Sequence, residues 1–227
     1  MPSHDAGLDL SRDGARLAPS ALGAAPLAEL ERLLADQPRD VAGVRQFGLE
    51  GLRPLLNAEG TVGRLAAEVL GPAARPVRAI LFDKTAAANW SLAWHQDRVI
   101  AVGERIEVEG FGPWSRKHGA VHVAPPFPLL ARMLTLRVHL DPVPETNAPL
   151  LVAPGSHRRG RIAETDVPAV VAACGVVSCL ADPGDIWLYA TPILHASDRA
   201  TAVNRRRVLQ VDYSADALPG GLEWLGV

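Results

Sequence analysis

Cysteine is scarce in this sequence, and long apolar runs and an excess of one charge are missing. The two cysteines, Cys174 and Cys179, are too few for a secreted disulfide framework, and their spacing is not that of a C-x-x-C redox or zinc motif. No stretch approaches the roughly 18 uninterrupted apolar residues of a membrane span, and the N-terminal segment MPSHDAGLDLSRDGAR lacks the apolar core of a signal peptide. We therefore predict a cytoplasmic protein with no membrane partner.

The charge balance argues against a polyanionic partner. Lys and Arg together number 23 against 25 Asp and Glu, which gives a net charge of −2 and no field that would gather nucleic acid. With 227 residues, 48% of them apolar and 21% charged, the chain is expected to form one globular domain around a substantial core. A small molecule is the expected binding partner, and no pattern indicates an oligomeric state.

The first third of the chain predicts helices rather than strands. Residues 1–25 are rich in Ala, Ser, Gly and Asp without periodicity, and we expect a loose N-terminal arm there. Leucines then recur at helical spacing after Pro26, and a second apolar stripe between residues 61 and 70 stops at Gly71-Pro72. Residues 26–75 are therefore predicted to be a helical support.

From residue 76 onward the pattern changes to short β-like runs between Pro, Gly, Asn and Asp. The runs are VRAILF, RVIAV, RIEVEG, LTLRVHL, PLLVAP, VVSCL, DIWLYA and RVLQVDY, and AETDVPAVVAACG is a short helix or loop among them. Many short strands after a helical segment predict a mainly β fold with supporting helices, a double-stranded β-helix or cupin-like jelly roll. Its core spans residues 76–215 of a single domain that spans residues 26–227.

Three residues have the chemistry of a mononuclear metal site. His95 and Asp97 are two positions apart, so an extended strand would project both from one face, and His195 ends the late strand GDIWLYATPILHAS. Two His and one carboxylate leave three coordination positions open, which suits Fe(II), a bidentate 2-oxo acid and O2. The His-x-Asp pair alone is weak support, because seven His make a chance pair common.

Longer segments resemble the phytanoyl-CoA dioxygenase-like enzymes in order and spacing. They are WHQD, LTLRVHLDPVPETNAPLLVAPGSHRRG and GDIWLYATPILHASDRATAVNRRRVLQVDY, and the resemblance covers about residues 77 to 215. Asn147-Ala148 stands where Asn-Gly is commoner, a departure in a turn rather than at a ligand. The resemblance implies an Fe(II)-dependent dioxygenase that uses 2-oxoglutarate and O2 and holds iron through His95, Asp97 and His195.

Family spacing also implies a cosubstrate site. The distal carboxylate of 2-oxoglutarate needs a fixed cation, and a guanidinium fork suits it. Among Arg205, Arg206 and Arg207, the eleven-residue spacing from His195 selects Arg206. The alternative is that all three lie at a solvated strand end and bind no cosubstrate. Ser197 and Lys84 are also predicted to bind the cofactor. The alternatives are that Ser197 is only a loop residue and that Lys84 is an exposed charge at a strand end.

Substrate-lining residues are predicted near the metal strand and in a loop segment over the barrel mouth. They are Trp90, Gln96, Arg98, Trp114, Lys117, His118 and His122. The predicted activity is hydroxylation of a C–H bond of a small molecule with release of succinate and CO2. The alternatives are a non-catalytic cupin-like binding module and a metal-dependent isomerase or hydrolase that uses the same triad.

Overall fold

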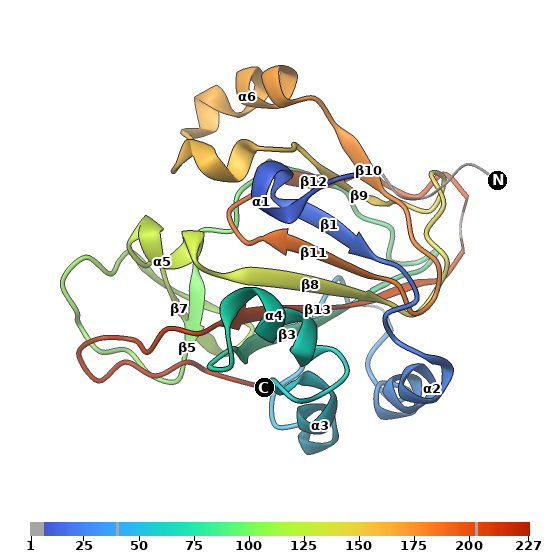
Figure 1. Cartoon of the computed structure of the whole chain (residues 1–227), viewed down its shortest axis with the longest axis horizontal. Helices are drawn as coiled ribbons and strands as arrows, with labels where there is room; N and C mark the ends of the chain where they lie inside the picture. Colours follow the sequence, from blue (N-terminus) through green and yellow to red (C-terminus); the bar gives the residue numbers. More distant parts are fainter. Residues whose placement is uncertain (1–6, 40, 203) are drawn as a thin grey trace.

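Two antiparallel sheets form the body of the protein, described by a computed structural model at residues 7–39, 41–202 and 204–227 (Figure 1). The larger sheet has the strand order β1-β11-β8-β13-β3-β2, and the smaller has the order β10-β9-β12-β4. The larger comprises β1 (Ala15–Ala18), β2 (Val44–Arg45), β3 (Arg75–Lys84), β8 (Leu134–His139), β11 (Ile186–Ala190) and β13 (Arg206–Ser214). The smaller comprises β4 (Leu92–His95), β9 (Leu150–Val152), β10 (Val177–Cys179) and β12 (His195–Ser197). The predicted mainly β jelly roll is confirmed.

Helices cover one face of the larger sheet. They are α2 (Ala24–Leu33), the 3-10 turn η1 (Glu50–Leu52), α3 (Arg53–Leu56) and α4 (Gly63–Leu70), and α4 lies beside β3 in Figure 1. Buried residues of these helices, such as Leu30 and Leu56, pack in one cluster with residues of the sheet. Both helices expected from the apolar periodicity, near residues 26–34 and 61–70, are present.

Strand β13 shows how the two faces of the sheet differ. Leu209, Val211 and Tyr213 belong to the core under the helices, and the Tyr213 hydroxyl donates a hydrogen bond of 2.9 Å to the carbonyl of Leu56. Residues alternate across a strand, so Arg206 and Gln210 face the other way, into the space between the sheets. The polar, ligand-lined face is thus the inner one.

The prediction of a loose N-terminal arm is wrong for its described part. Helix α1 (Leu10–Asp13) is capped by the Asp9 carboxylate, which accepts a bond of 2.8 Å from the backbone N–H of Arg12. Strand β1 then pairs with β11 along its length, and Ala15 is fully buried. Four residues at a sheet edge are too few to show periodicity, and most of their order comes from a partner strand distant in sequence. Residues 1–6 lie outside the described residues.

A third, small sheet lies beside one end of the larger sheet (Figure 1). It has the order β5-β7-β6 and comprises β5 (Ile100–Val102), β6 (Trp114–Lys117) and β7 (Ala120–Val123). The strand expected over RIEVEG is wrong, because residues 103–110 form no strand. Their alternating Ile106 and Val108 are half-buried beside Gly220 and Gly221 of the C-terminal segment, so packing against a loop produces the alternation there.

The remaining helices are short and lie between strands. They are α5 (Phe127–Ala131), the 3-10 turns η2 (Ser156–Arg159) and η3 (Glu164–Asp166), and α6 (Val167–Cys174). Helix α6 falls in the segment AETDVPAVVAACG, where a short helix or loop was expected. Among the described residues, no helix combines the length and hydropathy needed to cross a bilayer.

Candidate metal centre

The structure brings His95, Asp97 and His195 together at one edge of the smaller sheet. His195 begins β12 and lies opposite His95, the last residue of β4, with ring centroids 4.3 Å apart. One ligand atom from each of the three residues lies within 4.8 Å of the others. The expectation that His95 and Asp97 share a strand is wrong in detail, because β4 ends at His95 and Asp97 lies in the segment after it.

Backbone carbonyls fix which nitrogen of each imidazole is available. His95 Nδ1 lies 2.8 Å from the carbonyl oxygen of Ala93, and His195 Nδ1 lies 3.0 Å from that of Ile193. A carbonyl only accepts, so each Nδ1 carries the proton and each Nε2 keeps its lone pair. This outer hydrogen bond is the usual device that orients a metal-ligating imidazole.

The Asp97 carboxylate is oriented by a chain of buried polar groups. Arg78 in β3 donates to Asp97 at 3.3 Å and to Asp212 at 2.5 Å, and Asp212 accepts a bond of 3.0 Å from Thr135. Burial alone would raise the pKa of Asp97, but Arg78, His195 and His95 together hold it below its ordinary value. Asp97 is therefore a carboxylate ready to bind a cation, and a two-His, one-carboxylate set with open positions suits Fe(II).

A cavity of about 100 Å³ between the sheets extends from the triad to a group of buried cations. Lys84, Arg137 and Arg206 all line it, and their exposed fractions are 1%, 6% and 2%. None of the three forms an ion pair among the described residues. Lys84 donates to Ser197 Oγ at 3.2 Å and to the carbonyl of Asp198 at 2.8 Å, and Arg206 donates to the carbonyl of Ala148 at 2.6 Å.

Unpaired polar atoms gather at this cationic end. The Nε atoms of Arg137 and Arg206 are buried without a hydrogen-bond partner in the described part of the chain, as are both ring nitrogens of His139, which lies opposite Val208. Burial, with the charge of Arg137, lowers the pKa of Arg206 to about 9. Burial, with the charges of Arg206 and Arg137, lowers the pKa of Lys84 to about 7. Buried donors and uncompensated cations are stabilised by an anionic ligand, so this end of the cavity fits a carboxylate.

The neighbouring arginines have other partners. Arg205 is 38% exposed at its side chain and pairs with Asp83 at 2.7 Å, on the side of the strand away from the cavity. Arg207 pairs with Asp141 and Glu31, each at 2.7 Å. The predicted strand register is therefore the observed one, and among these three residues only Arg206 lines the cavity.

Of the other predicted cofactor and substrate residues, Trp90 and Ser197 line the same cavity. The Lys84 ammonium lies 5.1 Å from the Trp90 ring centroid, a cation–π distance. The alternative of Lys84 as an exposed strand-end charge is wrong. Arg98 lies farther out, where it donates to the carbonyl of Ile162 at 2.6 Å and pairs with Glu164 at 3.4 Å.

The four predicted residues after residue 110 belong to the small sheet and line neither of the two cavities that reach His95. Trp114 and Lys117 lie on β6, His118 is an exposed turn residue with φ of 49°, and His122 is fully buried on β7. The Trp114 indole donates to Glu107 at 3.2 Å. The two His were not expected to share a metal, and the turn at His118-Gly119 separates them.

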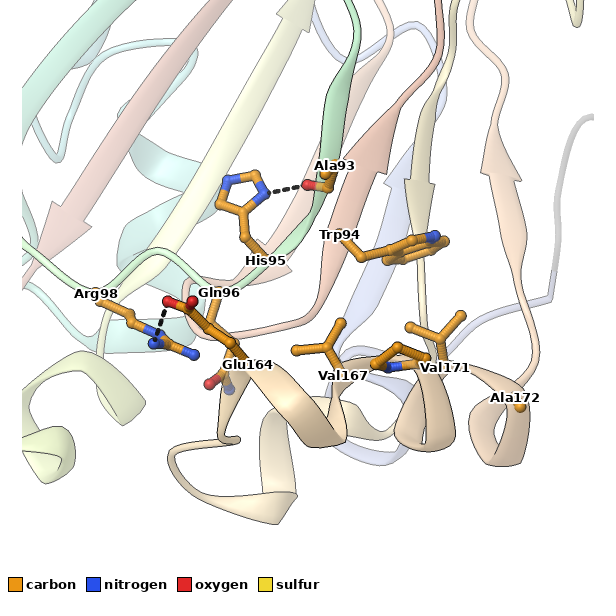
Figure 2. A pocket seen from close by; sticks show the side chains of 10 residues that line it. Ala93, Trp94, His95, Gln96, Arg98, Glu164, Val167, Val171 and Ala172 are labelled. Atoms are coloured by element: carbon orange, nitrogen blue, oxygen red, sulfur yellow. Dashed lines mark hydrogen bonds and ion pairs between the residues drawn. The ribbon is translucent and has the colours of Figure 1, made fainter.

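A second, larger space lies on the outer side of β4. It is a groove of about 710 Å³ whose apolar wall includes Trp94, Val167 and Val171, with the Arg98–Glu164 pair at one end (Figure 2). The rings of His95 and Trp94 point apart in Figure 2, as expected for consecutive strand residues. His95 thus borders the inner cavity and the outer groove, and α6 covers the groove.

Comparison with known proteins identifies the family. The sequence profile described as "Phytanoyl-CoA dioxygenase (PhyH)" matches residues 28–208. The chain belongs to the phytanoyl-CoA dioxygenase family. The predicted resemblance is confirmed, and the match covers most of the chain. Comparison with curated protein sequences gives no match.

Solved structures share the fold of this family member at low sequence identity. An iron-bound EctD from S. alaskensis has a TM-score of 0.69 and 20% identity, over 96% of this chain and 78% of that one. AviO1 from Streptomyces viridochromogenes Tue57 has a TM-score of 0.65 and 22% identity, over 93% and 94%. SnoN is described as a non-heme alpha-ketoglutarate-dependent epimerase from nogalamycin biosynthesis. Its TM-score is 0.62 and its sequence identity is 20%, over 93% of this chain and 87% of that one. Iron is named for the EctD structure and alpha-ketoglutarate for SnoN, which agrees with the predicted Fe(II) and 2-oxoglutarate, and the dioxygenase family agrees with the predicted O2.

Two charged residues of this phytanoyl-CoA dioxygenase family site were not predicted from the sequence. Arg78 orients Asp97, and Arg137 adds a third cation to the cavity. A signal was present for both, because Arg78 shares its strand face with Lys84, and Arg137 lies on the polar face of LTLRVHL. Nothing in the local sequence indicated which metal ligand or cavity these faces would meet.

Gln96, predicted to line the substrate site, holds loops together. Its buried amide donates to the carbonyls of Gly160 and Pro192, at 3.0 and 2.8 Å, and accepts from the N–H of Ile162 at 2.9 Å. We expect Gln96→Leu to lower the free energy of unfolding by about 3 kcal/mol, because several buried backbone groups would lose their partner. Urea unfolding measures this, and an unchanged midpoint would contradict the assigned role.

Proposed function

We propose that this protein is an Fe(II)- and 2-oxoglutarate-dependent dioxygenase that hydroxylates a C–H bond of a small molecule. The observation that carries the proposal is one cavity bordered both by a two-His, one-carboxylate set and by Lys84, Arg137 and Arg206, buried cations that form no ion pair with any described residue. The first feature suits Fe(II), and the second suits the distal carboxylate of the cosubstrate. The family match supports the same class.

One group of residues would bind the metal, and a second group would position the cosubstrate. His95, Asp97 and His195 would bind iron through Nε2, a carboxylate oxygen and Nε2, and Arg78 would keep the carboxylate in place. Arg206 would meet the distal carboxylate of 2-oxoglutarate, with Lys84 and Ser197 beside it. When bound, iron with 2-oxoglutarate and O2 supplies the oxidant, and succinate and CO2 are released.

Two alternatives use the same residues. A non-catalytic cupin-like module would bind the metal without turnover, and an isomerase or hydrolase would act without consuming 2-oxoglutarate. The description of SnoN as an alpha-ketoglutarate-dependent epimerase shows that a protein of this fold need not hydroxylate. Succinate formation that requires both Fe(II) and 2-oxoglutarate separates the proposed class from both alternatives, and a lack of succinate under these conditions would overturn the proposal.

The mass of the product tests the reaction itself. We expect substrate turned over in chloride-containing buffer to gain one oxygen atom and no chlorine. Asp97, beside the two His, would hold the ligand position that a halide would otherwise need. Mass spectrometry with 18O2 detects the added atom. A chlorinated product, or a product of unchanged mass, would contradict hydroxylation.

A further inference from the structure

Arg137 is a buried cation that the strand register places between the metal centre and Arg206. Arg137 of β8 lies opposite Gln210 of β13, and its side chain lines the inner cavity. Gln210 is four residues after Arg206 and two residues before Asp212. Asp212 belongs to the chain of polar groups that orients the metal ligand Asp97. Arg137 is therefore nearer to the metal end of the cavity than Arg206 is.

Hydrogen bonds connect the guanidinium of Arg137 to the metal side of the cavity. Its Nη1 donates to Oε1 of Gln210 at 2.8 Å, and the Tyr189 hydroxyl donates to the same oxygen at 3.2 Å. The ring centroids of Tyr189 and His195 are 5.7 Å apart. One amide oxygen and one phenol thus separate the guanidinium from a metal ligand. Its central carbon also lies 5.4 Å from the ring centroid of Phe82, which lines the same cavity.

No anionic partner balances the charge of Arg137 within the described residues. Its Nε atom is buried there without a hydrogen-bond partner, and Gln210, the acceptor of its Nη1 donor, is a neutral amide. A buried guanidinium without a counter-charge is costly, and unpaired buried donors call for an explanation such as a ligand. Burial lowers the pKa of Arg206, and the charge of Arg137 lowers it further. An anion beside Arg137 would offset this repulsion.

The proposed cosubstrate carries two carboxylates. For the distal one the cavity offers Arg206, with Lys84 and Ser197 beside it. The proximal carboxylate is next to the 2-oxo group, and a 2-oxo acid chelates a metal through these two groups, so the proximal carboxylate belongs at the metal end. Guanidinium groups toward the two ends of one cavity match the two charges of a dicarboxylate.

We propose that Arg137 binds the proximal carboxylate of 2-oxoglutarate and thereby fixes how the cosubstrate meets the metal. The proposal rests on the proposed function, because it requires 2-oxoglutarate to bind at the metal centre. A guanidinium donates in one plane and accepts nothing, so it would hold this carboxylate in one orientation. Gln210 in turn holds the guanidinium through Nη1 and would act as a positioning residue.

The test is the binding of two 2-oxo acids to the Fe(II)-loaded protein in the absence of oxygen. The probes are 2-oxoglutarate and 2-oxovalerate, which keeps the proximal carboxylate and has a methyl group in place of the distal one. Calorimetry measures affinity, and the visible absorption band of an Fe(II)–2-oxo acid chelate reports binding at the metal, so no turnover is needed. We expect the wild type to bind both acids, and 2-oxoglutarate more tightly.

Variants distinguish the two ends of the cosubstrate. Arg137→Met, which fills similar space without the charge, should weaken the binding of both acids by roughly 30-fold or more. Arg206→Met should weaken 2-oxoglutarate by a similar factor and change 2-oxovalerate by less than about threefold. Arg132→Met is the matched control and should change neither, because Arg132 is exposed before the same strand and pairs with Asp216.

A conservative variant keeps the test open if Arg137→Met does not fold. Arg137→Lys retains the charge and loses the guanidinium fork, so it should weaken the binding of 2-oxovalerate by at least about threefold. The width and position of the absorption band should also change, because the chelate would no longer be held in one orientation. A residue that only supports the fold would leave the band of the bound acid unaltered.

The results separate this proposal from the proposed function. If Arg137→Met weakens 2-oxoglutarate but not 2-oxovalerate, Arg137 acts at the distal end and the proposal is wrong. Unchanged binding of both acids in either Arg137 variant, or a wild type that does not bind 2-oxovalerate at about 50 mM, would also overturn it. Failure of the Fe(II)-loaded wild type to bind 2-oxoglutarate would overturn the proposed function, and the role of Arg137 with it.

Discussion

His195→Ala protein should form no detectable succinate and should bind Fe(II) more than about 100-fold more weakly than the wild type. That factor is the upper end for loss of a group that merely orients a ligand, and His195 would supply a ligand atom itself. Its Nδ1 is engaged by the carbonyl of Ile193, so Nε2 is the atom available to the metal. His95→Ala should behave in the same way. Succinate release and direct iron analysis measure the two effects separately.

The fold should survive this substitution, which makes the result interpretable. His195 borders the cavity, and the apolar core lies under the helices on the far face of the larger sheet. His157→Ala is a matched control, because it removes an imidazole from η2 rather than from the metal centre. Thermal unfolding and circular dichroism should be similar for all three variants. Wild-type iron affinity or measurable turnover in His195→Ala would overturn the triad.

The elements that could be predicted from sequence are those in which one face meets apolar groups. In β13, Leu209, Val211 and Tyr213 alternate with Arg206 and Gln210, and the structure places the two sets on opposite faces. Hydrophobic periodicity carries this information locally. The family spacing then distinguished Arg206 from its neighbours, a choice that the pattern alone left open.

What could not be predicted depends on partners far apart in sequence. The orienting role of Arg78 depends on Asp97 and Asp212, which come from a loop and from another strand. Strand β1 is ordered by β11, more than 160 residues later, and its own four residues show no pattern. Gln96 could equally have faced the substrate or the loops, because an amide suits either. These contacts are set by tertiary structure, which outweighs local preference at such positions.

Arg206→Ala should raise the 2-oxoglutarate concentration for half-maximal succinate formation by roughly 30-fold or more, while Arg205→Ala and Arg207→Ala should change it by less than about threefold. Losing one partner of a buried charge pair costs about 2 kcal/mol at least, which corresponds to roughly 30-fold in binding. Arg205 and Arg207 pair with carboxylates outside the cavity, so their loss acts on stability instead. Arg206→Lys should lie between, because it keeps the charge and loses the fork.

When cosubstrate is absent, Arg206 is expected to have the opposite effect and to lower the stability of the protein. Arg206 lies buried beside Arg137 and has no counter-ion among the residues that the structure describes, and burial and that repulsion lower its pKa to about 9. Arg206→Met, which fills similar space, should therefore unfold at a temperature equal to or above that of the wild type when 2-oxoglutarate is absent. Added 2-oxoglutarate should stabilise the wild type, by about 2.7 kcal/mol at 100 times its dissociation constant, and the variant far less. If Arg206→Met is instead destabilised without cosubstrate and still stabilised by it, Lys84 or Arg137 rather than Arg206 holds the distal carboxylate.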